Sequence, residues 1–231
     1  MEHPDTALDH HDRTEFQLER LILFTDAVFA IAITLLAIEL KVPEFEHRPS
    51  GAEVRQALLA LLPRFIGFLI SFVVIARYWM AHHRIFRFVR TYNQRLIGLN
   101  MLFLLTIVLM PFTTALYSEY PTTKAIFAIY SAGVVASGLC QILMQSYLSN
   151  PRHGLVWPSD VYHPDLHPAA PLVPVLGFGL SLLLLPVVPA GFYMLLPFLI
   201  LPFALLRNRW QKKLVARHTR MQALHFQRTQ Q

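Results

Sequence analysis

The hydrophobic pattern of this chain is a series of long apolar stretches separated by short polar segments. The first stretch runs from Arg20 to Pro43, and five more follow at residues 57–80, 95–117, 123–148, 171–188 and 190–206. A membrane-spanning helix needs about 20 consecutive, mainly apolar residues. The pattern therefore predicts an all-α, polytopic membrane protein, with six transmembrane helices in a domain that covers residues 20–206.

The last two apolar stretches are short and rich in proline. Pro186, Pro189, Pro197 and Pro202 fall within or between them. Proline removes a helical hydrogen bond and kinks or ends a helix. We interpret this region as two kinked helices joined by a tight turn at residues 187–191, and one long broken helix is the alternative.

The composition agrees with a membrane protein. Hydrophobic residues make up 55% of the 231 residues and charged residues only 15%. A soluble domain of this size needs far more charge to cover its surface. The single cysteine, Cys140, lies in an apolar stretch, so the chain offers neither a disulfide framework nor a cysteine-based metal site.

The basic residues predict how the chain is oriented in the membrane. Most lie at or before the start of the first stretch, in or beside the second connection, in the fourth connection and after the last stretch: Arg13, Arg20, Arg77, Arg84, Arg87, Arg90, Arg95, Arg152, Arg207, Arg209, Lys212, Lys213, Arg217, Arg220 and Arg228. The positive-inside rule then places both termini in the cytoplasm of a multi-pass protein of the cell membrane. Residues 1–19 form an exposed cytoplasmic tail rather than a cleaved signal, and residues 207–231 form a basic cytoplasmic tail. The net charge of +6 is explained by the anionic inner leaflet and requires no nucleic-acid partner.

Histidines in the connection before residue 171 are the nearest the chain comes to a metal site. His153, His163 and His167 have a spacing that fits no standard set of ligands. We expect them to be solvated loop histidines. No cofactor is expected, and no metal other than a permeating ion.

The first apolar stretch carries polar residues at positions where an anchoring helix has no use for them. Arg20 and Asp26 lie at its start, Thr34 near its middle, and Glu39 and Lys41 near its end. A charge inside the hydrocarbon costs a few kcal/mol at least, unless it is paired or faces water. The first helix is therefore predicted to belong to a site or a pathway.

Three apolar residues of this helix form a stripe. At about 100° per residue, Ile31, Leu35 and Ile38 fall within about 60° of one another, with Thr34 at the edge and Asp26 about 140° from Ile31. In one interpretation the stripe is ordinary packing, and the Thr34 hydroxyl bonds back to the carbonyl of Ala30. In the other, the stripe lines a symmetric pore that gates by dewetting, and Thr34 offers oxygen ligands to an ion.

Several residues resemble a known family. Arg20, Phe24, Thr25 and Asp26 are similar to the R-x-x-x-F-S-D signature of the transmembrane protein 175 family, which comprises lysosomal and bacterial potassium channels. Thr25 replaces the serine of the signature but keeps the hydroxyl. The run AVFAIAITLLAIELKVP that follows also resembles the first helix of that family. Further similarity lies in Trp79, His82, His83, Phe86 and Asn100 and in the stretch LMPF at residues 109–112.

The resemblance covers nearly the whole chain, including the six helices of a bacterial, single-repeat member, and it implies a function. Four subunits in a homotetramer would surround a central pore lined by the first helix, without a TVGYG-like filter segment. Ile31 would form the constriction, Leu35 and Ile38 further apolar rings, and Thr34 the selectivity site. The resemblance thus implies a passive potassium channel in the lipid bilayer, modestly selective and poorly conducting.

The polar residues of the signature are expected to form a network. Arg20, Thr25 and Asp26 lie near the cytoplasmic end of the first helix, at the depth of Trp79, His82 and His83. Asp26 would accept a hydrogen bond from the indole N–H or from a histidine, and Arg20 would supply another donor. We assign this network a structural or gating role, with ion binding or proton relay as the alternative. Glu39 either enriches cations at the outer mouth or is a snorkelling rim charge.

Two other functions compete with a potassium channel. A proton-conducting or proton-coupled pathway could use Asp26 with His82 or His83, because histidine titrates near neutral pH. A membrane-embedded enzyme would need clustered acids or ligands, and His82 and His83 point about 100° apart on a helix, which makes them poor co-ligands. We therefore expect no enzyme. A purely structural or partner-binding membrane protein stays open.

Overall fold

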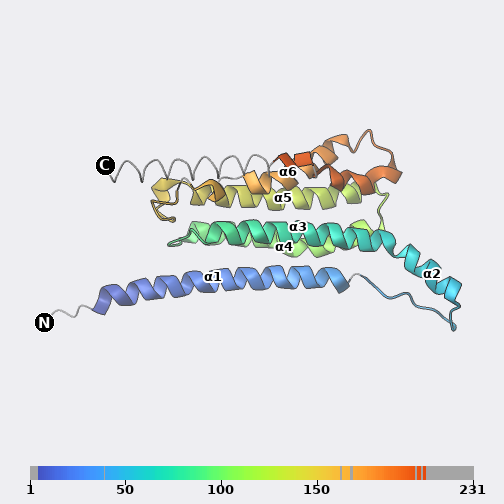
Figure 1. The fold of residues 1–231 in the computed structure, drawn as a ribbon, viewed down its shortest axis with the longest axis horizontal. Helices are drawn as coiled ribbons and strands as arrows, with labels where there is room; N and C mark the ends of the chain where they lie inside the picture. The colour runs from blue at the N-terminus through green and yellow to red at the C-terminus, as the bar shows by residue number, and fades with distance from the viewer. Residues whose placement is uncertain are drawn as a thin grey trace, which may run out of the picture.

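A computed structural model describes residues 5–38, 40–161, 163–166, 169–200, 202–203 and 205–206 of the chain. These residues are helical apart from connections and one isolated β-bridge. The long helices lie side by side along one axis, with α1 at one edge, α3 and α4 in the middle, and α5 and α6 at the opposite edge (Figure 1). Four of the described helices are long and apolar enough to cross a membrane.

The first helix, α1, runs from Asp5 to Ile38 and so begins and ends earlier than the predicted stretch at residues 20–43. It begins earlier because residues 5–19 include good helix formers such as leucine, glutamate and glutamine. It cannot extend through the end of the predicted stretch, because Pro43 disfavours the helical conformation of the residue before it. The part that qualifies as a membrane span is Glu15–Ile38. Glu39, the predicted outer-mouth residue, lies outside the described residues.

The predicted second helix at residues 57–80 is two helices in the structure. A short helix, α2, covers Gly51–Ala60, and a spanning helix, α3, covers Leu62–Phe86, with a proline in its first turn. Ser50 and Glu53 form a capping box at the start of α2, and hydrogen bonds from Ser50 and His47 lower the pKa of Glu53. None of the residues of α2 is buried, and Figure 1 shows the helix projecting beyond the end of the bundle.

The helices α4 (Gln94–Glu119) and α5 (Lys124–Leu148) confirm the stretches predicted at residues 95–117 and 123–148. They pack closely on each other and on α3. Buried hydroxyl groups join the three helices: Thr114 donates to the Ser71 hydroxyl at 2.8 Å, and the Tyr130 hydroxyl lies 3.0 Å from the same atom. Such bonds help helices associate inside a bilayer, where the hydrophobic effect does not drive them together.

The last two predicted stretches are shorter in the structure. The helix α6 covers Ala169–Leu184 and the 3-10 helix η3 covers Ala190–Leu199, with turn residues between them. Ser181 of α6 donates to the carbonyl of Leu196 of η3 at 3.0 Å, so the two segments are folded against each other. This arrangement agrees with two segments joined by a turn rather than one broken helix. Both are shorter than the four long spans.

The connection between α5 and α6 was expected to be irregular, with solvated histidines. It contains two short 3-10 helices, η1 (Pro151–His153) and η2 (Pro164–Leu166), and Val156 forms a β-bridge with Val89 before α4. Two of these histidines, His153 and His163, are partly exposed, as expected. Each also has a contact within the protein, since His153 lies 2.8 Å from the Tyr147 carbonyl and the ring centre of His163 lies 4.6 Å from that of Phe88. The third, His167, lies outside the described residues. Within the described part of the chain, no group of three or more potential ligands could hold a metal ion.

The close approach of α6 to residue 200 depends on a glycine. A Cβ at Gly177 would lie 2.8 Å from the Cα of Ile200, whereas a Cβ at Gly179 would meet nothing within 4 Å. We predict that Gly177→Ala destabilises the fold by about 1–3 kcal/mol, because a backbone contact cannot move aside easily. Thermal unfolding in detergent micelles measures this, with Gly179→Ala as the matched control. Equal melting temperatures for the two variants would show that α6 and η3 do not pack this closely.

Candidate functional site

One face of α1 is buried against the rest of the subunit. Thr25, Phe29, Ala32 and Leu36 are each at most 2% exposed. Their spacing of three or four residues places them on one side of the helix. This face packs on α3 and α4, which are the helices that α1 contacts most.

The opposite face of α1 carries the predicted stripe, and the subunit leaves it open. Ile31 is 58% exposed, Leu35 40% and Ile38 67%. Phe24 lies on the same face and is also exposed. The stripe is therefore not covered by the part of the chain that the structure describes. In a membrane protein, such a face meets lipid, another copy of the chain or the water of a pore.

Thr34 lies at the edge of the open face and is exposed. Its hydroxyl donates to the carbonyl of Ile31 at 2.9 Å, so the expected bond to Ala30 is replaced by one to the next carbonyl. Because the proton of the hydroxyl is used in this bond, the lone pairs of Oγ1 stay available on the open face. The arrangement can supply an oxygen ligand to a cation.

Asp26 is brought together with Trp79 of α3. The indole Nε1 donates to Oδ1 of Asp26 at 2.8 Å, and the carboxylate is half-buried. The ring of His83 stacks on the indole, with 5.4 Å between the ring centres. This contact joins the half-buried edge of α1 to α3.

Arg20 does not join this contact. Among the described residues, Trp79 is the side chain that donates to Asp26, and the Arg20 guanidinium lies 6.0 Å over the Phe16 ring instead. The reason is geometric: six residues along a helix separate two side chains by about 9 Å and about 120°. The expected second donor is therefore absent from the described contacts of Asp26.

Thr25 and His82 belong to a second, fully buried group that includes Asn100 of α4. The His82 Nε2 lies 3.0 Å from Asn100 Oδ1, and Asn100 Nδ2 donates to the Thr25 hydroxyl at 2.9 Å. The Thr25 hydroxyl donates a hydrogen bond to the carbonyl of Leu21 at 2.9 Å. All three side chains are at most 1% exposed. The group thus connects α3, α4 and α1 by one chain of hydrogen bonds.

The direction of these hydrogen bonds determines which nitrogen of the His82 imidazole carries a proton. Asn100 uses its amide nitrogen toward Thr25, so its oxygen accepts from His82, and Nε2 of the imidazole must carry a proton. Phe86 stacks on the imidazole at 4.0 Å, and Phe29 and Phe103 lie at 6.2 and 5.9 Å. These rings enclose the histidine away from the open face of α1.

The structure therefore separates the predicted network into two groups. Asp26, Trp79 and His83 form one, and Thr25 and His82 form the other. Sequence reasoning had noted Asn100 only as a point of resemblance and missed that it joins the buried group. The available signal was an amide within the apolar stretch at residues 95–117, since polar residues inside a membrane span are expensive.

Comparisons with known proteins show which family this chain is similar to. A family model described as "Endosomal/lysosomal potassium channel TMEM175" matches residues 20–111, which include both groups and the stripe. A protein of Streptomyces collinus named a potassium channel is 35% identical over 138 residues, which cover 58% of this chain and 66% of that protein. The human endosomal/lysosomal proton channel TMEM175 is 25% identical over 201 residues, which cover 83% of this chain and 39% of that protein.

A solved structure is similar as well. The crystal structure of a lysosomal potassium-selective channel TMEM175 homologue from Chamaesiphon minutus has a TM-score of 0.67 and 28% sequence identity. The similarity covers 83% of this chain and 98% of that one. By contrast, the chain spans just under two thirds of the length of the Streptomyces relative and about two fifths of the human one.

The buried group predicts how Thr25 responds to substitution. Thr25→Val keeps the shape but leaves Asn100 Nδ2 with no acceptor in a buried site, which costs about 1–3 kcal/mol. Thr25→Ser keeps the hydroxyl and loses only a methyl group, at about 1 kcal/mol or less. Thermal unfolding in detergent should therefore show a larger loss for valine than for serine. The reverse order would mean that the methyl group, and not the hydroxyl, holds α1 in place.

Proposed function

Because this chain belongs to the TMEM175 family, a family of ion channels and not of enzymes, we propose that it is a potassium channel. Potassium crosses passively, with modest selectivity, through a pore lined by α1 of each subunit. One observation carries this proposal. Within the region that matches the family, α1 has an exposed face formed by Ile31, Leu35 and Ile38, while its other side packs on α3 and α4.

The apolar side chains on the open face can form a hydrophobic gate. From Ile31 to Ile38 this face extends about 10 Å along the helix axis. When copies of this face surround an axis, they form apolar rings that expel water and resist ion passage. Such a pore is narrow and conducts poorly, and Ile31 forms its constriction.

Selectivity in this proposal comes from Thr34 and from the cost of dehydration. An ion that passes an apolar ring loses part of its hydration shell, and potassium holds its shell less tightly than sodium does. Thr34 lies along the helix between Ile31 and Ile38, each of which forms an apolar ring with its copies in the other subunits. Its Oγ1 replaces part of the hydration that the ion loses. Because its proton is bonded to the Ile31 carbonyl, the oxygen faces the ion with its lone pairs.

A pore of this kind requires several copies of the chain. One α1 helix cannot enclose a channel, so the proposal includes a homotetramer with α1 nearest to the axis. Beside the stripe, the exposed edge of α1 is built from the small residues Ala27, Ala30 and Ala37. Small residues let helices approach closely in a membrane, which favours contact between neighbouring copies along this edge.

The proposed topology keeps six crossings in the cell membrane and both termini in the cytoplasm. α6 and η3 make the last two crossings as a folded pair. The end of α1 at Ile38 then lies near the outer mouth, and Glu39, which is outside the described residues, follows it in the sequence. The basic residues 207–231, which lie outside the described part of the chain, are assigned to the cytoplasmic side by their charge.

The two polar groups have a structural role in this proposal. Thr25 and Asp26 are neighbours on α1, and each is bonded to a different helix: Thr25 to Asn100 of α4 and Asp26 to Trp79 of α3. Together they fix the rotation of α1 and hence the direction in which the stripe points. A movement that opens the pore must either carry α3 and α4 along or break one of these bonds.

Proton conduction is the second candidate, favoured by the name of the human relative. A relay between Asp26 and His82 has little support, because the two side chains belong to separate groups and His82 is bonded to Asn100. If protons cross this protein, we propose that they share the pore with potassium. His82→Gln would then leave a proton current in place.

The constriction is tested by Ile31→Asn. A polar ring lets water enter, so we predict a rise in potassium current of about two- to tenfold in planar bilayers. Ile129→Asn is the control, because Ile129 is similarly exposed, at 50%, but lies on α5. An unchanged or smaller current in Ile31→Asn, with normal reconstitution, would remove Ile31 from the pore.

Thr34 is tested by reversal potential under opposed potassium and sodium gradients. Thr34→Ala removes one oxygen ligand, and we predict that the permeability ratio of potassium to sodium falls about two- to tenfold. Thr34→Ser keeps the oxygen and should retain most of the ratio. A ratio that stays high in Thr34→Ala would assign selectivity to the apolar rings alone.

A further inference from the structure

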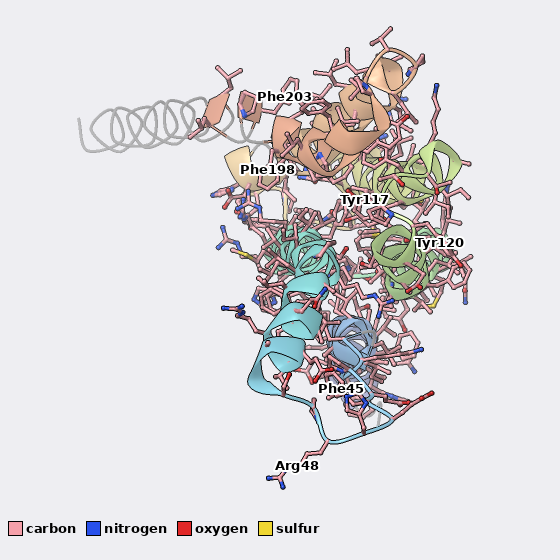
Figure 2. The ribbon with its side chains drawn as sticks, turned by 90° about the vertical axis from the view of Figure 1, so that its right-hand side faces the viewer. Phe45, Arg48, Tyr117, Tyr120, Phe198 and Phe203 are labelled. Atoms are coloured by element: carbon pink, nitrogen blue, oxygen red, sulfur yellow. The ribbon has the colours of Figure 1, made fainter. Side chains whose placement is uncertain are left out.

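The proposed function leaves a polar pocket at one end of the bundle unused. The pocket has a volume of about 270 Å³ and lies where the segment after α1 meets the first turn of α3 and the last turn of α4. It is lined by Lys41, Arg64, Ala115, Ser118, Glu119 and Tyr120. Figure 2 views the molecule from this end, with Tyr120 labelled at the end of α4.

The lining is rich in hydrogen-bond donors. Lys41 and Arg64 bring two positive charges, and Glu119 brings one negative charge among the described lining residues. Arg64 donates to Glu119 from one of its five N–H groups, so the guanidinium keeps further donors. Ser118 and Tyr120 add hydroxyl groups. This chemistry suits an anion with several oxygens, and a phosphate fits it best.

The position of the pocket relative to the membrane indicates which molecule carries the phosphate. Arg64 lies in the first turn of one span, and Glu119 is the last residue of another. The pocket therefore lies at the boundary between hydrocarbon and water, where lipid headgroups are found. On the same face of α4, deeper in the membrane, Val108 is 50% and Phe112 61% exposed, which gives an acyl chain a surface to follow.

We propose that this pocket binds the phosphate of an anionic membrane lipid, held by Lys41 and Arg64, with an acyl chain along the exposed face of α4. The bound phosphate ties the end of α1 to the ends of α3 and α4. The proposal does not depend on what passes through the pore, since the pocket and its lining belong to a single subunit.

The test is lipid binding to the purified full-length chain in a neutral detergent. Titration with a short-chain phosphatidylglycerol, followed by native mass spectrometry, should show saturable binding. Lys41→Gln should weaken this binding about tenfold, the effect of one charge-assisted hydrogen bond. Lys41→Arg keeps the charge and should bind like the original chain.

The matched control is Arg48→Gln. Arg48 carries the same charge in the connection that follows α1, but Figure 2 shows it pointing away from the bundle. If Arg48→Gln weakens binding as much as Lys41→Gln, only the overall charge matters and the pocket is not a site. Glycerol phosphate, titrated in the same way, should bind far more weakly than the lipid. Equal binding of the two would overturn the lipid as the source of the phosphate.

Discussion

The structure depends on how firmly one face of α1 is held. His82, Asn100 and Thr25 form a chain of hydrogen bonds across three helices, fully removed from solvent. In an environment of low dielectric constant these bonds are strong, and an unpaired member is costly. The Trp79 bond to Asp26 adds a second attachment one residue further along α1. Two neighbouring attachments to different helices leave α1 little freedom to rotate.

The fixed rotation of α1 determines which of its faces the subunit leaves open. Because Thr25, Phe29 and Leu36 face inward, Ile31, Leu35 and Ile38 must face outward. α3, α4 and α5 form a body held by its own buried hydroxyl groups, and α6 with η3 covers the far side. The subunit therefore presents one helix, with one face open, at its edge (Figure 1). In the proposed channel that face becomes the wall of the pore.

The sequence predicted the helical membrane fold well where the pattern was strong. α4 and α5 are long, mainly apolar and bounded by polar residues, so their limits agree with prediction to within a few residues. α1 and α3 were misplaced at their ends, because helix propensity and proline act there rather than hydropathy. The pairing of Trp79 with Asp26 was expected from chemistry, whereas the Asn100 bridge requires knowing that α4 lies between α3 and α1. Helical spacing alone grouped Ile31, Leu35 and Ile38 into one stripe but left open whether the stripe packs inside the subunit. The structure shows that the side of α1 that packs on α3 and α4 is a different one.

Aqueous accessibility of the open face tests the central claim most directly. With Cys140 replaced by alanine, Thr34→Cys would be exposed to a charged, water-soluble thiol reagent during potassium flux from vesicles. Ile129→Cys, at a similarly exposed position of α5, is the reference. If α1 lines a pore, the reagent blocks flux through Thr34→Cys and leaves Ile129→Cys unaffected. If the cysteine of Thr34→Cys does not react with the charged reagent but reacts with a lipid-soluble one, the open face of α1 contacts lipid, and the pore lies elsewhere.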